Sequence, residues 1–152
     1  MIALTVVIHA IALDRLVFSL EKIGPKIFKI FYQFWEIPLM IFTVLGVFLT
    51  HIVQIWLWGV LFLYLAPDIL PDLESALYFS TSSFTTVGFG DIYLDKEWRL
   101  LSSFESANGF ILFGWSTAFI FEIISKLYKN QSIKNESIKR NERIKTIETE
   151  IE

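Results

Sequence analysis

The sequence predicts an all-α membrane protein, and two properties of the chain carry this prediction. Hydrophobic residues make up 54% of the 152 positions and charged residues only 19%, which gives a mean hydropathy of +0.54. One apolar run occupies 39–65, and a second, more polar run occupies 100–128. A helix of about 20 apolar residues crosses the hydrocarbon core of a bilayer, so each run is long enough to span it.

The composition also argues against several functional classes. The chain has no cysteine, which excludes disulfides and thiolate metal sites, and its net charge of −3 gives no electrostatic reason to bind nucleic acid. His9 and His51 lie in different segments, and no nucleophile or metal-binding motif accompanies them. We therefore expect no enzyme, no soluble substrate and no cofactor, and membrane lipid as one partner.

The first 38 residues divide into two expected segments. We expect an N-terminal membrane helix at 1–20, although Asp14 and Arg15 interrupt its apolar run and leave open a helix lying in the interface. Residues 21–38 are expected to be cytoplasmic or interfacial. Within them, 26–37 place apolar side chains on one face, which predicts an interfacial helix leading into the next span.

The distribution of lysine and arginine predicts the orientation. Basic residues lie in 21–38 and are frequent in the tail at 129–152, whereas 66–98 carry six acidic residues against Lys96 and no other basic residue. By the positive-inside rule, 21–38 and 129–152 are cytoplasmic and 66–98 are outside. Met1 is then outside too, provided that the first helix crosses.

A short apolar segment interrupts the outer connection. Residues 73–84 follow Asp72, which can cap a helix, and Glu74 lies in the expected first turn. This helix is too short to span and too apolar for an exposed loop, so we expect it to be re-entrant. Non-helical backbone at membrane depth is tolerated only beside protein or a water-filled cavity, so the residues that follow should line a cavity.

Those residues read TTVGFGD, at 85–91. Gly88 and Gly90 alternate with bulkier residues, and glycine accepts positive φ at little steric cost. Alternating backbone handedness can turn successive carbonyls to one side, and such oxygens suit a monovalent cation that must bind and leave. The expected ladder consists of the carbonyls of Thr86, Val87, Gly88 and Phe89. One loop cannot surround an ion, so the pore requires four copies of the chain.

The pattern resembles potassium channels of the two-transmembrane, one-pore-loop type. ALYFSTSSFTTVGFGD, ending at Asp91, is similar to their pore helix and filter, EWRLL at 97–101 to the start of their inner helix, and NGFILFGWSTAF at 108–119 to its middle. The resemblance implies a homotetrameric potassium-channel pore fold with a selectivity filter, in a bacterial inner membrane. Its pore domain covers 39–128, with outer helix 39–65, pore helix 73–84, filter 85–91 and inner helix 100–128. Potassium would bind at Thr86, Val87, Gly88 and Phe89, with Gly90 completing the filter.

The resemblance also assigns supporting residues. Tyr78 takes the place of an aromatic cuff residue and can reach Asp91, with Thr85 beside the filter. Ser82 stands where some simple bacterial channels carry a glutamate that bonds to the filter aspartate, and it is too short to do the same. Gly109 occupies the usual hinge place of the inner helix.

One face of the inner helix is a candidate cavity wall and gate. Phe113, Thr117 and Phe121 recur at i, i+4 and i+8, and rings of Phe121 could form a hydrophobic constriction. The alternative is that these phenylalanines face lipid or neighbouring helices. Gly109 and Gly114 could permit bending or close helix packing.

Polar residues inside the spans have structural and functional interpretations. His51 and Gln54 share a face of the outer helix, which favours interhelical hydrogen bonds to Asn108 or Glu105. The alternative is a proton sensor at His51. Glu122 precedes Lys126 by four residues, which favours an ion pair over attraction of cations to the inner mouth.

The charged tail is a candidate helix. It is either exposed to solvent or forms a short bundle that reinforces an oligomer through Ile144, Ile147 and Ile151. Two alternatives to a potassium channel remain at this level: a less selective monovalent cation channel, and a non-conducting membrane subunit of a larger complex.

Overall fold

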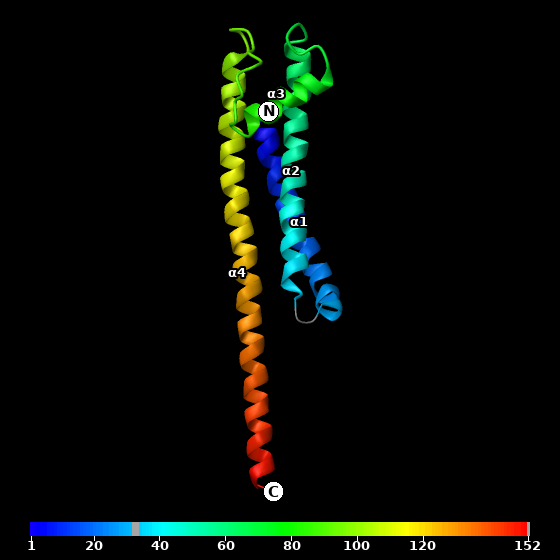
Figure 1. The fold of residues 1–152 in the computed structure, drawn as a ribbon, viewed down its shortest axis with the longest axis vertical. Coiled ribbons are helices and arrows are strands. Elements are labelled where there is room, and N and C mark those ends of the chain that lie inside the picture. Colours follow the sequence, from blue (N-terminus) through cyan, green and yellow to red (C-terminus); the bar gives the residue numbers. More distant parts are fainter. Residues whose placement is uncertain (32–33, 152) are drawn as a thin grey trace.

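Four helices make up the computed structural model, which describes residues 1–31 and 34–151. They are α1 (Ile2–Ile30), α2 (Glu36–Leu65), α3 (Leu73–Phe84) and α4 (Arg99–Ile151). The long helices α2 and α4 lie side by side, with the short α3 between them at the end of the molecule where the N-terminus lies (Figure 1). The described chain contains no strand, which confirms the predicted all-α class.

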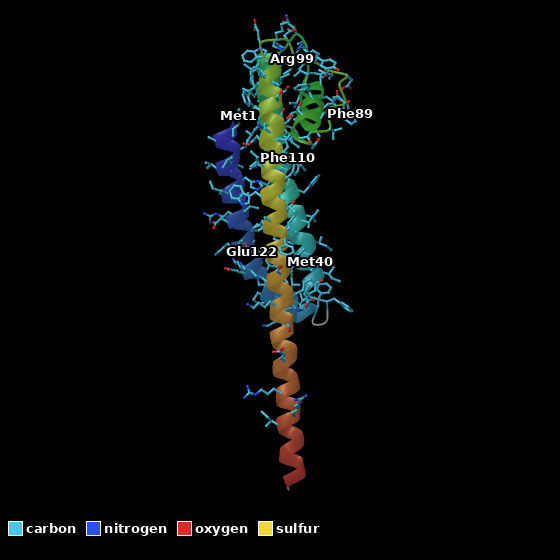
Figure 2. The ribbon with its side chains drawn as sticks, turned by 90° about the vertical axis from the view of Figure 1, so that its left-hand side faces the viewer. Met1, Met40, Phe89, Arg99, Phe110 and Glu122 are labelled. Atoms are coloured by element: carbon cyan, nitrogen blue, oxygen red, sulfur yellow. The ribbon has the colours of Figure 1, made fainter. Side chains whose placement is uncertain are left out.

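Three of these helices are long and apolar enough to cross a membrane. They are α1, α2 and the segment Arg99–Lys129 of α4. Figure 2 shows Arg99 and Phe89 at one end of this bundle, and Glu122 much further along α4. The expected N-terminal membrane helix is therefore present as a third apolar helix beside the two spans expected from the longer apolar runs.

The first helix is longer than the 1–20 predicted from its apolar run. It has 29 residues, which at about 1.5 Å per residue gives a length of about 44 Å. That length matches a bilayer with its headgroup regions rather than the hydrocarbon core alone. Hydropathy identifies only the residues that lie in the hydrocarbon core. The helix itself extends beyond that apolar run and includes Lys22, Lys26 and Lys29.

The interfacial helix expected at 26–37 is not formed as one element. Residues 26–30 belong to the end of α1, where the Phe31 N–H bonds to the Ile27 carbonyl. The next helix begins at Glu36, a few residues before the apolar run that predicted it. The apolar face of 26–37 is therefore divided between two helices on either side of a turn.

The last helix continues without interruption to Ile151, whereas the apolar run ends near residue 128. The sequence from 129 to 152 contains no glycine or proline, so no residue breaks the backbone hydrogen bonding where lipid gives way to water. Ile144 is 46% exposed, and the side chains of Ile147 and Ile151 lie outside the described part.

Two apolar clusters hold the helices together. The larger one joins α2, α3 and α4, and Trp58, Phe62, Phe84 and Leu112 are fully buried in it. The smaller one packs Leu13 and Leu16 of α1 against Val47 of α2. The larger cluster surrounds α3, so it fixes the position of the loop that follows this helix.

Candidate functional site

Asp72 fixes the start of α3. Its carboxylate accepts a hydrogen bond from the Ser75 backbone N–H at 2.8 Å, and this bond lowers the pKa of the Asp72 carboxyl. The residue therefore stays ionised at the positive end of the helix dipole. The helix begins at Leu73 and ends at Phe84, which are the bounds predicted from the sequence.

The loop after α3 has an alternating backbone. Positive φ angles occur at Thr86 (61°), Gly88 (57°) and Gly90 (76°), whereas the two residues between them have negative φ. Threonine is β-branched and rarely adopts this region, so Thr86 is held there by its surroundings. Alternation of this kind is what lets successive carbonyls share one side of an extended segment.

Backbone N–H groups of this loop are bonded to the last turns of α3. Thr86 N–H donates to the Ser83 carbonyl at 3.0 Å, and Gly88 N–H to the Ser82 carbonyl at 3.1 Å. Within the described chain, no carbonyl of residues 85–90 accepts a hydrogen bond. Uncharged oxygens without protein donors therefore accumulate in this one segment.

Ser82 has a role that the sequence reasoning missed. Its hydroxyl oxygen accepts a hydrogen bond from the Phe89 backbone N–H at 3.2 Å, so the serine contacts the loop backbone rather than Asp91. A short hydroxyl one turn before a helix end is too common to signal this contact from the sequence. Thr85, by contrast, bonds its hydroxyl back to the Thr81 carbonyl at 2.6 Å.

Tyr78 and Asp91 make the contact expected at the C-terminal end of the loop. The Tyr78 hydroxyl donates to the Asp91 carboxylate at 2.6 Å. This bond lowers the pKa of Asp91 and raises the pKa of Tyr78. The Tyr78 ring also stacks on Phe89, with ring centroids 6.1 Å apart and planes 8° from parallel.

A polar cavity of about 350 Å³ lies beside the loop. Its walls come from α3, the loop and the first turns of α4, and they include Tyr78, Ser82, Asp91, Ser103 and Ser106. The Ser106 hydroxyl donates a hydrogen bond to the Ser83 carbonyl at 2.8 Å. Within this chain, short hydroxyls are therefore the side chains that support the back of the loop.

Gly109 brings α4 against the end of α3. A Cβ at this position would clash with the carbonyl of Phe84 and lie 2.9 Å from its carbonyl carbon. Of the two sequence-based alternatives for Gly109, bending and close packing, this contact supports packing. The backbone of α4 can therefore approach the residue that immediately precedes the loop.

The candidate cavity-wall residues do not share one environment. Phe113 packs between helices of the chain, with its ring centroid 4.4 Å from that of His51 and 5.6 Å from that of Phe84. Thr117 bonds its hydroxyl to the Phe113 carbonyl at 2.9 Å, and Phe121 is 71% exposed. A Cβ at Gly114 would meet nothing within 4 Å.

A ring of polar side chains joins α1, α2 and α4 below the loop. The side-chain carbonyl of Gln54 lies 3.1 Å from His51 Nδ1, and its amide nitrogen lies 3.1 Å from His9 Nδ1. The Ser116 hydroxyl lies 2.9 Å from His51 Nε2 and 3.3 Å from His9 Nε2. The expected interhelical bonds of His51 and Gln54 exist, but their partners are Ser116 and the N-terminal helix, not Asn108 or Glu105.

The directions of these bonds are mutually consistent when both histidines are neutral. The Gln54 amide donates to His9 Nδ1, so His9 carries its hydrogen on Nε2 and donates to Ser116. Ser116 then donates to His51 Nε2, and His51 Nδ1–H donates back to the Gln54 carbonyl. Each atom of this polar ring (His9, Gln54, His51 and Ser116) thus has one role, and the second Gln54 N–H reaches the Thr5 carbonyl at 3.2 Å.

The two polar residues proposed as partners of His51 lie elsewhere. Asn108 donates to the Thr5 hydroxyl at 2.8 Å, which adds another contact to α1. Glu105 is fully buried and accepts a bond from the Ser80 hydroxyl at 2.6 Å. Further along α4, Glu122 and Lys126 form the predicted ion pair, at 2.6 Å.

Comparison with known proteins identifies the arrangement. Residues 48–126 match a family model described as ion channel, and these residues contain most of α2, all of α3 and the loop, and the apolar part of α4. No curated protein and no solved structure matches the chain. Since the match covers more than half of the sequence, the chain belongs to the ion channel family with the two-transmembrane, potassium-channel type of pore domain, preceded by an additional N-terminal apolar helix.

Proposed function

We propose that four copies of this chain form a potassium-selective channel, with the loop 86–90 as its filter. The observation that carries the proposal is the combination found in this loop: positive φ at every second residue and carbonyls that accept no bond from the described chain. Four such segments around one axis give rings of carbonyl oxygens that replace the hydration shell of a potassium ion. Ions then move by repulsion between neighbouring sites.

Exposure of apolar side chains supports the assembly. Val87 is 56% and Phe89 is 67% exposed in the single chain, although they belong to a loop at membrane depth. Apolar side chains at the ends of a re-entrant segment require cover from protein, because lipid does not solvate the adjacent backbone. Neighbouring copies provide that cover when the loops meet at a central axis.

The charge distribution sets the orientation that we propose. Residues 21–38 and the tail carry the lysines and arginines, so they lie in the cytoplasm, and the filter mouth with Asp91 lies outside. Asp91 is ionised there at neutral pH, and the bond from the Tyr78 hydroxyl lowers its pKa further. An ionised carboxylate at the mouth attracts cations before they lose water.

A less selective cation channel is the second candidate, and one observation favours it. Side-chain support from α3 reaches the loop backbone through the Ser82 hydroxyl at 3.2 Å, beside a cavity of about 350 Å³. A loop whose backbone is supported from behind by short hydroxyls can widen and admit sodium.

Flux from purified protein in liposomes tests both candidates. A potassium gradient should drive uptake, and the reversal potential in mixed potassium and sodium should follow potassium. A reversal potential that follows both ions equally would support the less selective channel. No flux under either gradient would contradict conduction by this chain alone.

A further inference from the structure

A carboxylic side chain that the proposed filter does not use lies behind the short helix α3. Glu105 of α4 is fully buried, at 0% exposure. Within the described chain it forms no ion pair, since the ion pair found there joins Glu122 and Lys126. Its side chain is already covered inside a single chain, so no cation of a neighbouring copy can reach it. The charge of an ionised Glu105 would therefore have no counter-charge.

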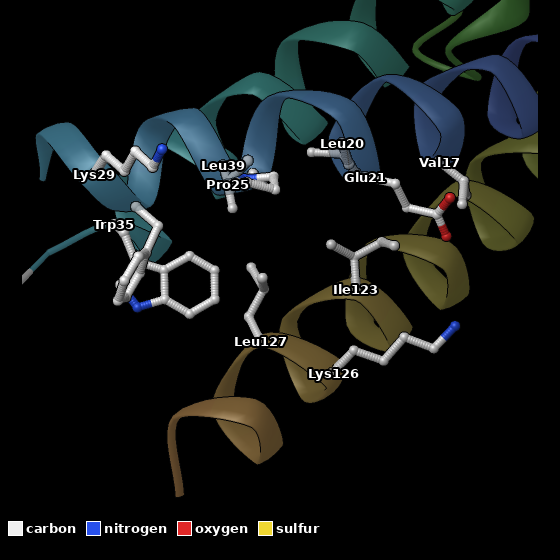
Figure 3. A pocket seen from close by; sticks show the side chains of 12 residues that line it. Val17, Leu20, Glu21, Pro25, Lys29, Trp35, Leu39, Ile123, Lys126 and Leu127 are labelled. Atoms are coloured by element: carbon white, nitrogen blue, oxygen red, sulfur yellow. The ribbon is translucent and has the colours of Figure 1, made fainter. Parts of the chain in front are cut away.

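Acidic residues elsewhere along the spans have water or a cation beside them. Glu122 pairs with Lys126 at 2.6 Å, and both side chains are more than half exposed. Glu21 lines a cavity of about 650 Å³ that opens between α1 and α4, and Lys126 belongs to the same lining (Figure 3). Glu105 has neither kind of neighbour, and an unpaired charge in an apolar interior is costly.

Glu105 contacts a serine that also reaches a third helix. Ser80, in the middle of α3, is fully buried as well. Its hydroxyl oxygen lies 2.6 Å from Glu105 Oε1 and 2.9 Å from the Ile55 carbonyl oxygen of α2. Each contact taken alone can use the Ser80 hydroxyl as its donor, but a hydroxyl has one hydrogen and serves one of them. The other contact needs a hydrogen from its second partner.

The count of hydrogens decides the direction of both bonds, because a length of 2.6 Å suits either direction. The Ile55 carbonyl cannot donate, so the Ser80 hydrogen points to it and the second hydrogen comes from Glu105. If Glu105 were ionised, Ser80 would donate to it, and two oxygens would face each other at 2.9 Å without a hydrogen. Glu105 Oε2 has no partner in the described chain. In the neutral acid this atom is an uncharged carbonyl oxygen, which costs less to leave unpaired than a charged one.

We propose that Glu105 is a positioning residue for the filter, as a neutral acid that donates to Ser80, which donates in turn to the Ile55 carbonyl. This relay (Glu105, Ser80 and the Ile55 carbonyl) connects α4, α3 and α2. It lies inside the residues that match the ion channel family. The proposal rests on the proposed function, because an effect on ions requires that the loop after α3 is the filter.

The relay lies between two close backbone contacts of α3. At one end of this helix, Gly109 of α4 packs against the Phe84 carbonyl. At the other end, a Cβ at Gly59 of α2 would lie 3.4 Å from the Ala76 carbonyl oxygen. Ala76, Ser80 and Phe84 are four residues apart, so they follow one side of the helix. The helix α3 is therefore held at three successive turns, and the loop bonded to its last turns takes its position from it.

Infrared spectroscopy of the full chain tests the protonation state. The protein is purified in a detergent without ester or carboxyl groups, so that the carbonyl band of a protonated carboxyl at neutral pH comes from the protein. We expect this band in the wild type and its loss in Glu105→Gln. Glu122→Gln is the matched control, since it removes an ion-paired acid from the same helix and should keep the band. A wild type without the band, or a band that survives in Glu105→Gln, would overturn the proposal.

Reversal potentials in mixed potassium and sodium test the positioning role. Glutamine is neutral and keeps a donor at the same place, so Glu105→Gln should retain the wild-type permeability ratio. Leucine fills a similar volume without a donor. We expect Glu105→Leu to lower the ratio of potassium to sodium permeability about threefold, the effect of one interhelical hydrogen bond in a membrane. Ser80→Ala should lower it similarly, and the double variant no further, because both changes break the same relay.

Equal losses in Glu105→Gln and Glu105→Leu would contradict a role as donor, and additive losses in the double variant would contradict a shared relay. If Glu105→Leu does not assemble, the infrared band and the ratio in Glu105→Gln still decide. The two proposals fail separately. The band without flux contradicts the channel alone, whereas flux without the band contradicts the neutral acid alone.

Discussion

The carbonyl of Phe84 occupies the space that a side chain at Gly109 would need. This contact places the backbone of α4 directly against the end of α3, one residue before the loop begins to turn. Its consequence is that the size of one residue near the N-terminal end of α4 controls the position of the loop.

Gly109→Ala should therefore destabilise the subunit. Overpacking a well-packed site costs about 1–3 kcal/mol, and the displaced group here is backbone, which cannot rotate away. We expect the protein in detergent to lose its assembled form at a lower midpoint temperature. We also expect reduced potassium flux. Gly114→Ala is the matched control, because a Cβ there meets nothing within 4 Å; an equal loss in the control would contradict the packing role.

Tyr78→Phe should shift the acid sensitivity of the loop mouth to a higher pH. The bond from the Tyr78 hydroxyl is the largest cause that lowers the pKa of Asp91, so its removal raises that pKa toward its ordinary value of about 3.9. A group with a lowered pKa keeps its contribution above that pKa and loses it as the pH falls through it. Loss of flux on external acidification should thus begin at a higher pH in the variant.

Tyr93→Phe serves as the control for this titration. It removes a phenol near the same mouth that forms no hydrogen bond with Asp91 in the described chain. The two pH profiles should differ, with the control close to the wild type. Superimposable profiles of wild type and Tyr78→Phe would show that the tyrosine does not tune Asp91.

Ser82→Ala should weaken selectivity. The substitution leaves the Phe89 backbone N–H without its acceptor, and an unsatisfied donor costs about 1–3 kcal/mol. We expect the ratio of potassium to sodium permeability, taken from reversal potentials, to fall. Ser103→Ala changes another serine of the same cavity, whose hydroxyl bonds to the Arg99 carbonyl and, in the described chain, makes no hydrogen bond with the loop, and it should keep the ratio.

The polar ring, which lies below the loop, predicts that ion flux responds to acid. An extra proton on His9 or His51 places two donors against each other, since each ring atom already has one role in the neutral arrangement. We expect α1 to loosen from α4 and flux to rise once the pH is low enough to protonate one of these buried imidazoles.

His51→Gln should abolish that rise in flux. The change in the pH profile of His9→Gln measures how much of the response depends on His9. Flux through the His51→Gln variant that keeps the wild-type pH profile would contradict a proton sensor and leave the ring as a structural contact. In that case each lost bond should cost about 0.6 kcal/mol of helix association.

The local elements of the fold followed from local signals. Apolar run length identified the spans at 39–65 and 100–128, and the capping aspartate with the following apolar turn gave α3 its bounds. The bond between Tyr78 and Asp91 was also expected, because the resemblance of the loop to known filters specified both residues. Helix ends were less accurate, since charged residues without glycine or proline continue a helix out of the membrane.

The sequence by itself determined that this chain is a helical membrane protein with a short capped helix before a channel-type loop, because hydropathy, capping and the motif act within one segment. Only the tertiary structure decided which side chains meet across segments: His51 with Ser116 and the N-terminal helix, Ser82 with the backbone of Phe89, and Gly109 with Phe84. Such contacts depend on the rotation of each helix about its axis. Each residue advances that rotation by about 100°, and periodicity within one apolar helix does not reveal which neighbour faces it.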